Sequence, residues 1–150
     1  MLNGREAEKL FAKIAEKRGV VMRSTAEEDM TEHWDYTVDS VKYDVKAYKK
    51  LNRWDRKGSD VVWLELTNVR GNVGWLRGKA DKIALLTREG FVIVDRKKLL
   101  NFALSFVESN TIYTKKEYRR WYRREGRQDV ITYVYLDDIK NLVEEIWKCE

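Results

Sequence analysis

The sequence predicts an α/β fold in which a central mixed β-sheet is flanked by helices. Apolar residues recur at helical spacing near the start of the chain, after residue 95 and near its end. Between these segments lie short alternating or continuously apolar runs that are typical of strands. With 150 residues and 43% hydrophobic content, the chain can bury a core of its own, so we expect one domain over residues 1–150.

The composition indicates an intracellular protein. No apolar run approaches the roughly 18 residues that a membrane-spanning helix needs, and the charged N-terminal residues lack the apolar region of a signal peptide. Cys149 is the only cysteine and there is one histidine, so neither an intrachain disulfide nor a Cys- or His-based zinc site is expected. We therefore expect a reducing, cytoplasmic location and no membrane partner.

The net charge bears on the kind of partner. Lys and Arg number 30 against 25 Asp and Glu, which gives a net charge of +5. A positive protein favours an anionic partner, of which nucleic acid is the commonest. The alternative is ordinary solubility charge, which reaches this size in domains without an anionic partner.

The start of the chain predicts a helix, a strand and a loop. Asn3 can cap a helix over residues 4–18, which Gly19 ends. A short strand over residues 20–23 follows, and the polar, acidic residues 25–32 are expected to form a loop. The apolar residues of the helix predict one buried face, formed by Ala7, Leu10, Phe11, Ile14 and Ala15.

Residues 33–50 predict a β-hairpin that turns at Asp39 and Ser40. In a hairpin, the residue numbers of every pair of facing residues add up to the same value. A loop of two or four residues around Asp39 and Ser40 gives the same pairing, so Val38 faces Val41. Because strand side chains alternate between faces, one face of the hairpin is apolar and the other polar. The apolar face comprises Trp34, Tyr36, Val38, Val41, Tyr43, Val45 and Ala47, and the polar face comprises His33, Asp35, Lys42, Asp44, Lys46 and Tyr48.

The same register places two carboxylates opposite each other. Asp35 faces Asp44, with β-carbons about 5 Å apart, and like charges in this position weaken a sheet. A divalent cation between them removes this penalty, and hard carboxylate oxygens suit Mg²⁺ or Mn²⁺. Lys46 lies two residues beyond Asp44 on the same face. The polar face therefore predicts a metal site with an adjacent lysine.

An Asp on one strand and Asp-x-Lys on the next resembles the PD-(D/E)XK nuclease superfamily. Trp34 stands where the family name has Pro, and Asp44 replaces the commoner Glu. The resemblance covers roughly residues 4–95 and implies a restriction-endonuclease-like core. It implies a metal-dependent endodeoxyribonuclease in which Asp35, Asp44 and the main-chain carbonyl of Val45 hold Mg²⁺ or Mn²⁺. Lys46 would position the attacking water or stabilise charge on the phosphate.

Within this superfamily, the layout is similar to that of the small, basic Holliday-junction resolvases. That subclass implies a homodimer that cleaves branched DNA during recombination. A restriction-like or nicking endonuclease encoded by a phage or mobile element is the alternative subclass.

Two glutamates are further candidates. Members of the superfamily often carry a Glu on the first helix that reaches toward the metal, and Glu8 matches that position; the alternative is a solvated carboxylate paired with a neighbouring Lys. Glu65 lies in the strand predicted over residues 61–67, which is apolar on both faces as a central strand is. A lone carboxylate there is costly unless it binds metal or water beside Asp44, or forms a buried ion pair.

The middle of the chain predicts loops around a second hairpin. Residues 52–60 are expected to form a charged loop, and the glycine-rich residues 68–78 a flexible one. Strands over residues 81–86 and 91–94 are joined by a turn at 87–90. Asp95 then caps a helix over residues 96–108, whose inner side comprises Leu99, Leu100, Ala103, Phe106 and Val107.

Residues 113–127 form the most basic segment. Thr114 with Glu117 fits a capping box, which predicts a short helix with cations on one side and Tyr118, Trp121 and Tyr122 interleaved. Cations neutralise phosphates and aromatic rings stack on bases, so this segment predicts a DNA-binding surface. The alternative is a solvated basic face anchored by its aromatics. The candidate DNA-binding residues are Lys115, Lys116, Arg119, Arg120, Arg123 and Arg124.

The chain is expected to end with a strand and a helix. Residues 129–136 predict the last strand, and Asp137 caps a closing helix with Ile139, Leu142, Val143 and Ile146 as its buried stripe. Two non-enzymatic alternatives remain open for the whole chain. One is a nucleic-acid-binding module that has the nuclease fold without catalysis, and the other is a protein-interaction domain.

Overall fold

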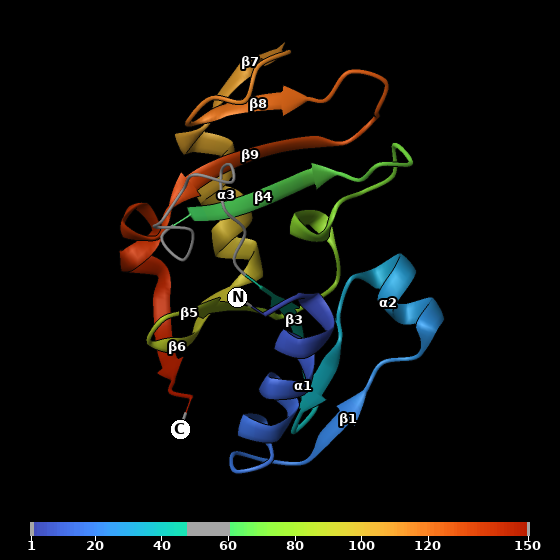
Figure 1. Ribbon diagram of the computed structural model, residues 1–150, viewed down its shortest axis with the longest axis vertical. Helices are drawn as coiled ribbons and strands as arrows, with labels where there is room; N and C mark the ends of the chain where they lie inside the picture. The colour runs from blue at the N-terminus through green and yellow to red at the C-terminus, as the bar shows by residue number, and fades with distance from the viewer. Residues whose placement is uncertain (1, 48–60, 150) are drawn as a thin grey trace.

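The protein has a mixed α/β fold with two separate β-sheets (Figure 1). The computed structural model describes residues 2–47 and 61–149, with the backbone alone at 109–111. The helices are α1 (Gly4–Ala15), α2 (Ala26–Glu32) and α3 (Arg96–Phe106), with short 3-10 helices η2 (Trp75–Arg77) and η3 (Leu136–Leu142). In this part of the chain, no helix is long and apolar enough to cross a membrane.

The first sheet has six strands in the order β1-β2-β3-β5-β6-β10. Only its β3–β5 pair is parallel; the other neighbours are antiparallel. The mixed sheet predicted from the sequence is therefore confirmed. Its strands are β1 (Val21–Arg23), β2 (Tyr36–Val38), β3 (Val41–Lys46), β5 (Lys82–Thr87), β6 (Gly90–Asp95) and β10 (Val143–Trp147).

The second sheet has four strands in the order β4-β9-β8-β7 and lies above the first in Figure 1. The strand predicted over residues 61–67 forms, but the prediction that it is central in the main sheet is wrong, because β4 pairs with β9 at the edge of this second sheet. The strands are β4 (Val61–Thr67), β7 (Glu108–Tyr113), β8 (Arg120–Arg123) and β9 (Val130–Tyr135).

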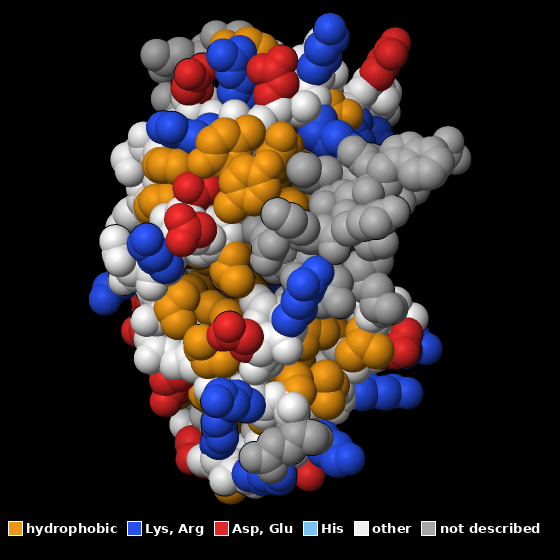
Figure 2. Space-filling model, turned by 60° about the vertical axis from the view of Figure 1, so that its left-hand side comes forward, with side chains coloured by type: hydrophobic (Ala, Val, Ile, Leu, Met, Phe, Trp, Pro, Cys, Tyr) orange, Lys and Arg blue, Asp and Glu red, His pale blue; other side chains and the backbone are white. Residues whose placement is uncertain are grey.

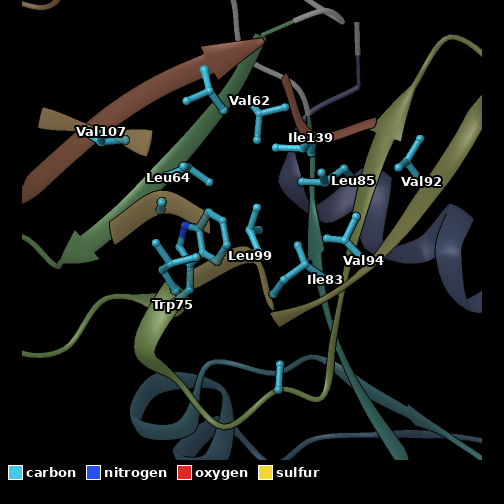
Figure 3. Close-up of a cluster of buried hydrophobic side chains, with 14 of the residues drawn as sticks. Val62, Leu64, Trp75, Ile83, Leu85, Val92, Val94, Leu99, Val107 and Ile139 are labelled. Carbon is cyan, nitrogen blue, oxygen red and sulfur yellow. The ribbon is translucent and has the colours of Figure 1, made fainter. Parts of the chain in front are cut away.

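The six-stranded sheet has a hydrophobic core on each face. Helix α1 covers one face with Ala7, Phe11, Ile14 and Ala15. Helix α3 and the four-stranded sheet cover the other, where side chains from β4, β5, β6 and α3 converge (Figure 3). The second face is thus covered by a helix and a sheet together, instead of the helices alone that the sequence predicted.

Local signals explain the elements that were predicted. The Asn3 side chain accepts a hydrogen bond from the Glu6 N–H and starts α1, and Asp95 caps α3 through the Lys98 N–H. The second predicted hairpin forms as β5 and β6. Gly90, with φ of 131°, allows β10 to approach β6, since a β-carbon there would lie 2.3 Å from the Trp147 carbonyl oxygen.

Three segments differ from the predictions. Residues 26–32 form α2, not a loop: Thr25 and Glu28 make a capping box, but the helix buries no residue and so shows no apolar periodicity. The basic segment is not a helix; Arg120–Arg123 form β8. The chain ends in η3 and β10 instead of a closing helix, because Trp147 packs into the α1 core while Ile146 points outward.

Phe11 is the centre of the α1 core, and its ring lies 5.4 Å from each of the rings of Tyr43, Phe91 and Trp147. We expect Phe11→Ala to lower the free energy of unfolding by about 3–5 kcal/mol, because it leaves a cavity where three elements meet. Met22→Ala on β1 is the control: that side chain is 64% exposed, and we expect a change within about 0.5 kcal/mol. Urea unfolding measures both, and an equal, small effect would contradict this assignment of the core.

Candidate active site

The hairpin register predicted from the sequence is confirmed. Strands β2 and β3 pair with Tyr36 opposite Tyr43 and Val38 opposite Val41. The Asp35 N–H donates to the Tyr43 carbonyl oxygen at 2.8 Å. This bond is one residue out of the β2–β3 register, so the regular ladder ends at Tyr36 and Asp35 lies just beyond it. Asp35 and Asp44 are neighbours through a hydrogen bond between their side chains, and both are buried, with exposed fractions of 5% and 3%.

The faces of β3 separate core residues from charged ones. Tyr43 and Val45 belong to the core under α1, so Asp44 and Lys46 point to the opposite face. Trp34 was predicted to share the α1 face and does not, since it packs in the core beneath α3. The strand begins only at Tyr36, and His33 has a left-handed backbone with φ of 59°, so alternation does not extend back to Trp34.

Four of the predicted site residues come together. The Val45 N–H donates to Asp35 Oδ2 at 2.7 Å, and Lys46 Nζ lies 3.3 Å from Asp44 Oδ2. The Lys46 side chain is one-third exposed, whereas that of Asp44 is almost fully buried. A buried carboxylate pair is therefore connected to the surface by one lysine.

Burial and mutual repulsion shift the pKa values in this cluster. Burial and the Asp44 charge raise the pKa of Asp35 to about 9, against the opposing Val45 N–H. Burial also raises the pKa of Asp44, although Lys46 acts in the other direction. Burial alone would lower the pKa of Lys46, but Asp44 and Asp35 outweigh it and the pKa is raised. At neutral pH, Asp35 thus holds a proton, and Lys46 lies within ion-pair distance of Asp44.

Lys46 also lines a cavity of about 180 Å³ between the two sheets. Glu65 of β4 lies in its wall, and its charge helps to raise the pKa of Lys46. Trp75 of η2 packs with its ring 5.1 Å from Lys46 Nζ, and His33 Nε2 lies 2.9 Å from the Val73 carbonyl oxygen. The carboxylates of Asp35 and Asp44 are behind Lys46 and do not line this cavity.

The sequence did not assign a role to His33 or Trp75 at this site. His33 was placed on the polar face of the hairpin, and its charge acts on Asp44. Trp75 lies far along the chain in a loop, and only the tertiary fold brings it over Lys46. Of the polar face predicted for the hairpin, Tyr48 lies outside the described residues, as does the loop predicted over residues 52–60.

Glu8 is held by Arg23 instead of by a neighbouring Lys. Its Oε1 accepts a hydrogen bond from Arg23 Nη2 at 3.0 Å, and Arg23 Nη1 donates to the Tyr36 hydroxyl at 2.8 Å. The charge of Glu8 also contributes to the raised pKa of Asp35. Glu8 thus lies near the carboxylate pair, at its α1 side, while Glu65 approaches from the second sheet.

The donor set fits a hard divalent cation. Within the described part of the chain, Asp44 Oδ2 is buried without a hydrogen-bond partner, and Lys46 Nζ lies 3.3 Å from it. In a strand, the N–H and C=O of one residue point to the same edge, so the Val45 carbonyl is directed toward the Asp35 side. Among the described residues, no three His, Cys, Asp or Glu side chains gather as a metal cluster. Mg²⁺ is commonly bound through one or two carboxylates with water and substrate oxygens completing its shell.

The candidate DNA-binding cations do not form one helical face, because the segment is extended. Arg119 packs over the Phe106 ring at 3.9 Å. Arg120 pairs with Glu108 and Glu117, and Arg124 pairs with the buried Asp129. Lys115, Lys116 and Arg123 are exposed.

Comparison with known proteins adds no relative. No family model matches this chain, and no curated protein or solved structure matches it either.

The raised pKa of Asp35 predicts a pH-dependent stability in the absence of metal. Between about 3.8, the ordinary value, and about 9 in the folded protein, the folded state holds one more proton than the unfolded state. Stability from this group is therefore lost as pH rises through that window, by at most about 1.4 kcal/mol per pH unit. Asp35→Asn removes this dependence, so its stability relative to wild type should increase with pH.

Urea unfolding in EDTA near the two ends of the window measures this difference. Asp137→Asn is the matched control, because that side chain is 85% exposed and should not change the pH profile. A relative stability of Asp35→Asn that does not rise with pH would show that Asp35 is ionised in the folded protein.

Metal binding at the pair should stabilise the fold. A ligand that binds only the folded state at about 100 times its Kd adds about 2.7 kcal/mol, so Mg²⁺ or Mn²⁺ should raise Tm. Asp44→Asn should abolish that rise, whereas Asp137→Asn should keep it. Equal metal-induced shifts in wild type and Asp44→Asn, measured by thermal unfolding, would exclude Asp44 as a ligand.

Proposed function

We propose that this protein is a metal-dependent DNA endonuclease of the PD-(D/E)XK type, which hydrolyses phosphodiester bonds. One observation supports the proposal: the side chains of Asp35, Asp44 and Lys46 meet at the open end of the β2–β3 hairpin, as the motif requires. Had Asp35 and Lys46 pointed to opposite faces, no nuclease centre could form. The restriction-endonuclease-like core is part of this proposal and is supported by α1 packing against the same hairpin.

The residues divide the chemistry between them. Asp35 and Asp44, with the Val45 carbonyl, would hold Mg²⁺ or Mn²⁺, which supplies Lewis-acid polarisation of the phosphate and a bound water of lowered pKa. Asp35 must lose its proton to act as a ligand, so metal binding releases a proton. Lys46 reaches the cavity and can donate an N–H to a phosphate oxygen that gains charge. Glu8 and Glu65 remain candidates for contact with metal or water.

The reaction proposed is hydrolysis. The oxygen of water forms a bond to phosphorus, the bond from phosphorus to the 3′ oxygen breaks, and that oxygen takes up a proton. Catalysis then depends on how much more strongly Lys46 binds the transition state than the ground state. Branched DNA such as a Holliday junction, cleaved by a homodimer, is the narrower form of the proposal.

A non-catalytic nucleic-acid-binding module is the second candidate, and one observation favours it. Both carboxylates are almost fully buried, and Lys46 is already paired with Asp44. Such a cluster can serve as a structural ion pair with no reaction. DNA binding without cleavage in either metal would support this candidate.

Cleavage assays on supercoiled plasmid and on a synthetic four-way junction test the proposal. We expect Mg²⁺- or Mn²⁺-dependent cleavage by wild type and a loss of about 100-fold or more in the single-turnover rate of Lys46→Ala at saturating DNA. Binding affinity should remain near that of wild type. Lys13→Ala, an exposed lysine on α1, is the control and should cleave normally. Cleavage by Lys46→Ala at the wild-type rate would show that Lys46 is not the catalytic lysine of an Asp-x-Lys motif.

A further inference from the structure

The outer face of the four-stranded sheet carries an array of aromatic rings. Along β9, Val130, Thr132 and Val134 are buried, so Tyr133 and Tyr135 point to the opposite face. Trp63 of β4 lies directly opposite Tyr133 in the register. Tyr118 joins them through an isolated bridge to Tyr133. We call these four residues, Trp63, Tyr118, Tyr133 and Tyr135, the aromatic platform.

The rings of the platform contact one another and are held in place. Ring centroids lie 5.3 Å apart for Trp63 and Tyr133 and 5.1 Å apart for Tyr118 and Tyr135. The Tyr118 hydroxyl donates to Asp138 Oδ2 at 2.7 Å, and the same oxygen accepts the Tyr135 N–H at 2.8 Å. Because these groups are fixed before any ligand arrives, binding to the platform orders few side chains.

The rings are also accessible. Tyr135 is 38% exposed, and the other three rings are half-buried. Figure 2 shows hydrophobic side chains gathered in the upper half of the molecule, where the second sheet lies, with Lys and Arg side chains at their border. This arrangement combines flat apolar surface with positive charge.

The positive charge of the protein is concentrated beside this platform. Residues 113–127 hold seven Lys or Arg and two Glu, a net charge of +5, which equals the net charge of the whole chain. Lys116 Nζ lies 5.9 Å from the Trp63 ring centroid. Two acids beside the platform are engaged: Glu117 pairs with Arg120, and Asp138 accepts from Tyr118 and Tyr135.

We propose that the aromatic platform binds single-stranded nucleic acid, with unpaired bases stacked on its rings and phosphates on Lys115 and Lys116. Aromatic rings stack on any base face that is free, and cations along the rim neutralise the backbone. A duplex hides its base faces in its own stack and cannot use the rings. The charge favours a polyanion over a protein partner, for which an apolar face alone would suffice.

The platform is continuous with the candidate active site. Trp63 contacts Tyr133 on the platform and also lines the cavity that holds Lys46. An unpaired strand on the rings would therefore lead its backbone toward that cavity. Binding to the platform does not depend on the proposed nuclease activity, because its four residues are not metal or phosphate ligands in that proposal.

Fluorescence anisotropy with a labelled oligothymidine of about 15 nucleotides, in EDTA so that no cleavage occurs, tests the proposal. We expect the single strand to bind more tightly than a duplex of equal length. Tyr135→Leu, which keeps apolar bulk but removes the ring, should weaken binding by about 5- to 150-fold, the factor that stacking of one base supplies. Tyr135→Phe keeps the ring and should bind like wild type.

Two further variants complete the design. Ile146→Ala on β10, whose side chain is 39% exposed, is the control for general loss of apolar surface and should bind like wild type. Lys115→Ala should lower the salt slope of binding by about 0.7, the value for one phosphate of a single strand.

Several results would contradict the proposal that the platform binds single-stranded nucleic acid. If thermal unfolding shows that both proteins are folded and Tyr135→Leu binds with the same affinity as wild type, the rings are not part of the binding surface. Equal or tighter binding of the duplex shows that unpaired bases are not recognised. A protein that binds no oligonucleotide but forms dimers that Tyr135→Leu disrupts uses this face for protein contact instead.

Discussion

The alternation of side chains along β3 is the constraint on which the candidate site depends. Tyr43 and Val45 must lie against the ring of Phe11, so Asp44 and Lys46 are forced to the other face. A slip of one residue against the neighbouring strands would turn Asp44 and Lys46 into the core under α1 and remove Tyr43 and Val45 from it, at a cost of several kcal/mol. The apolar core beneath α1 therefore fixes the register of β2 and β3, and Asp35, just beyond the end of β2, is held beside Asp44 by side-chain hydrogen bonds to Asp44 and to the Val45 N–H.

Charge balance explains how Asp35 and Asp44 can both be buried. With a proton on Asp35 and an ion pair between Asp44 and Lys46, the three side chains carry no net charge. A lone buried carboxylate would be far more costly. If a divalent cation replaced the proton, the same group would carry a net charge of +1 and would attract a phosphate. The cluster is thus compatible with a neutral, metal-free state and with a positively charged, metal-bound state that attracts an anionic ligand.

The parts that the sequence could predict are those specified by neighbouring residues. Caps, the register of a tight hairpin and its two faces are local properties, so α1, β2–β3 and the meeting of Asp35, Asp44 and Lys46 could be predicted. The second sheet could not, because a strand that is apolar on both faces looks the same in either sheet, and its partner β9 lies in the last third of the chain. The basic segment had a capping-box pattern that tertiary pairing overrode, and the apolar residues of the C-terminal segment fit either a helix or an edge strand.

Tertiary structure also decides which residues surround Lys46. His33, Glu65 and Trp75 come from three separate elements, and nothing in their local sequence links them to the hairpin. They meet because α3 and the four-stranded sheet cover the charged face of the main sheet, which places the edge strand β4 over the end of β3. Since Trp63 of the same strand contacts both the cavity and the ring of Tyr133, the edge of β4 joins the two surfaces.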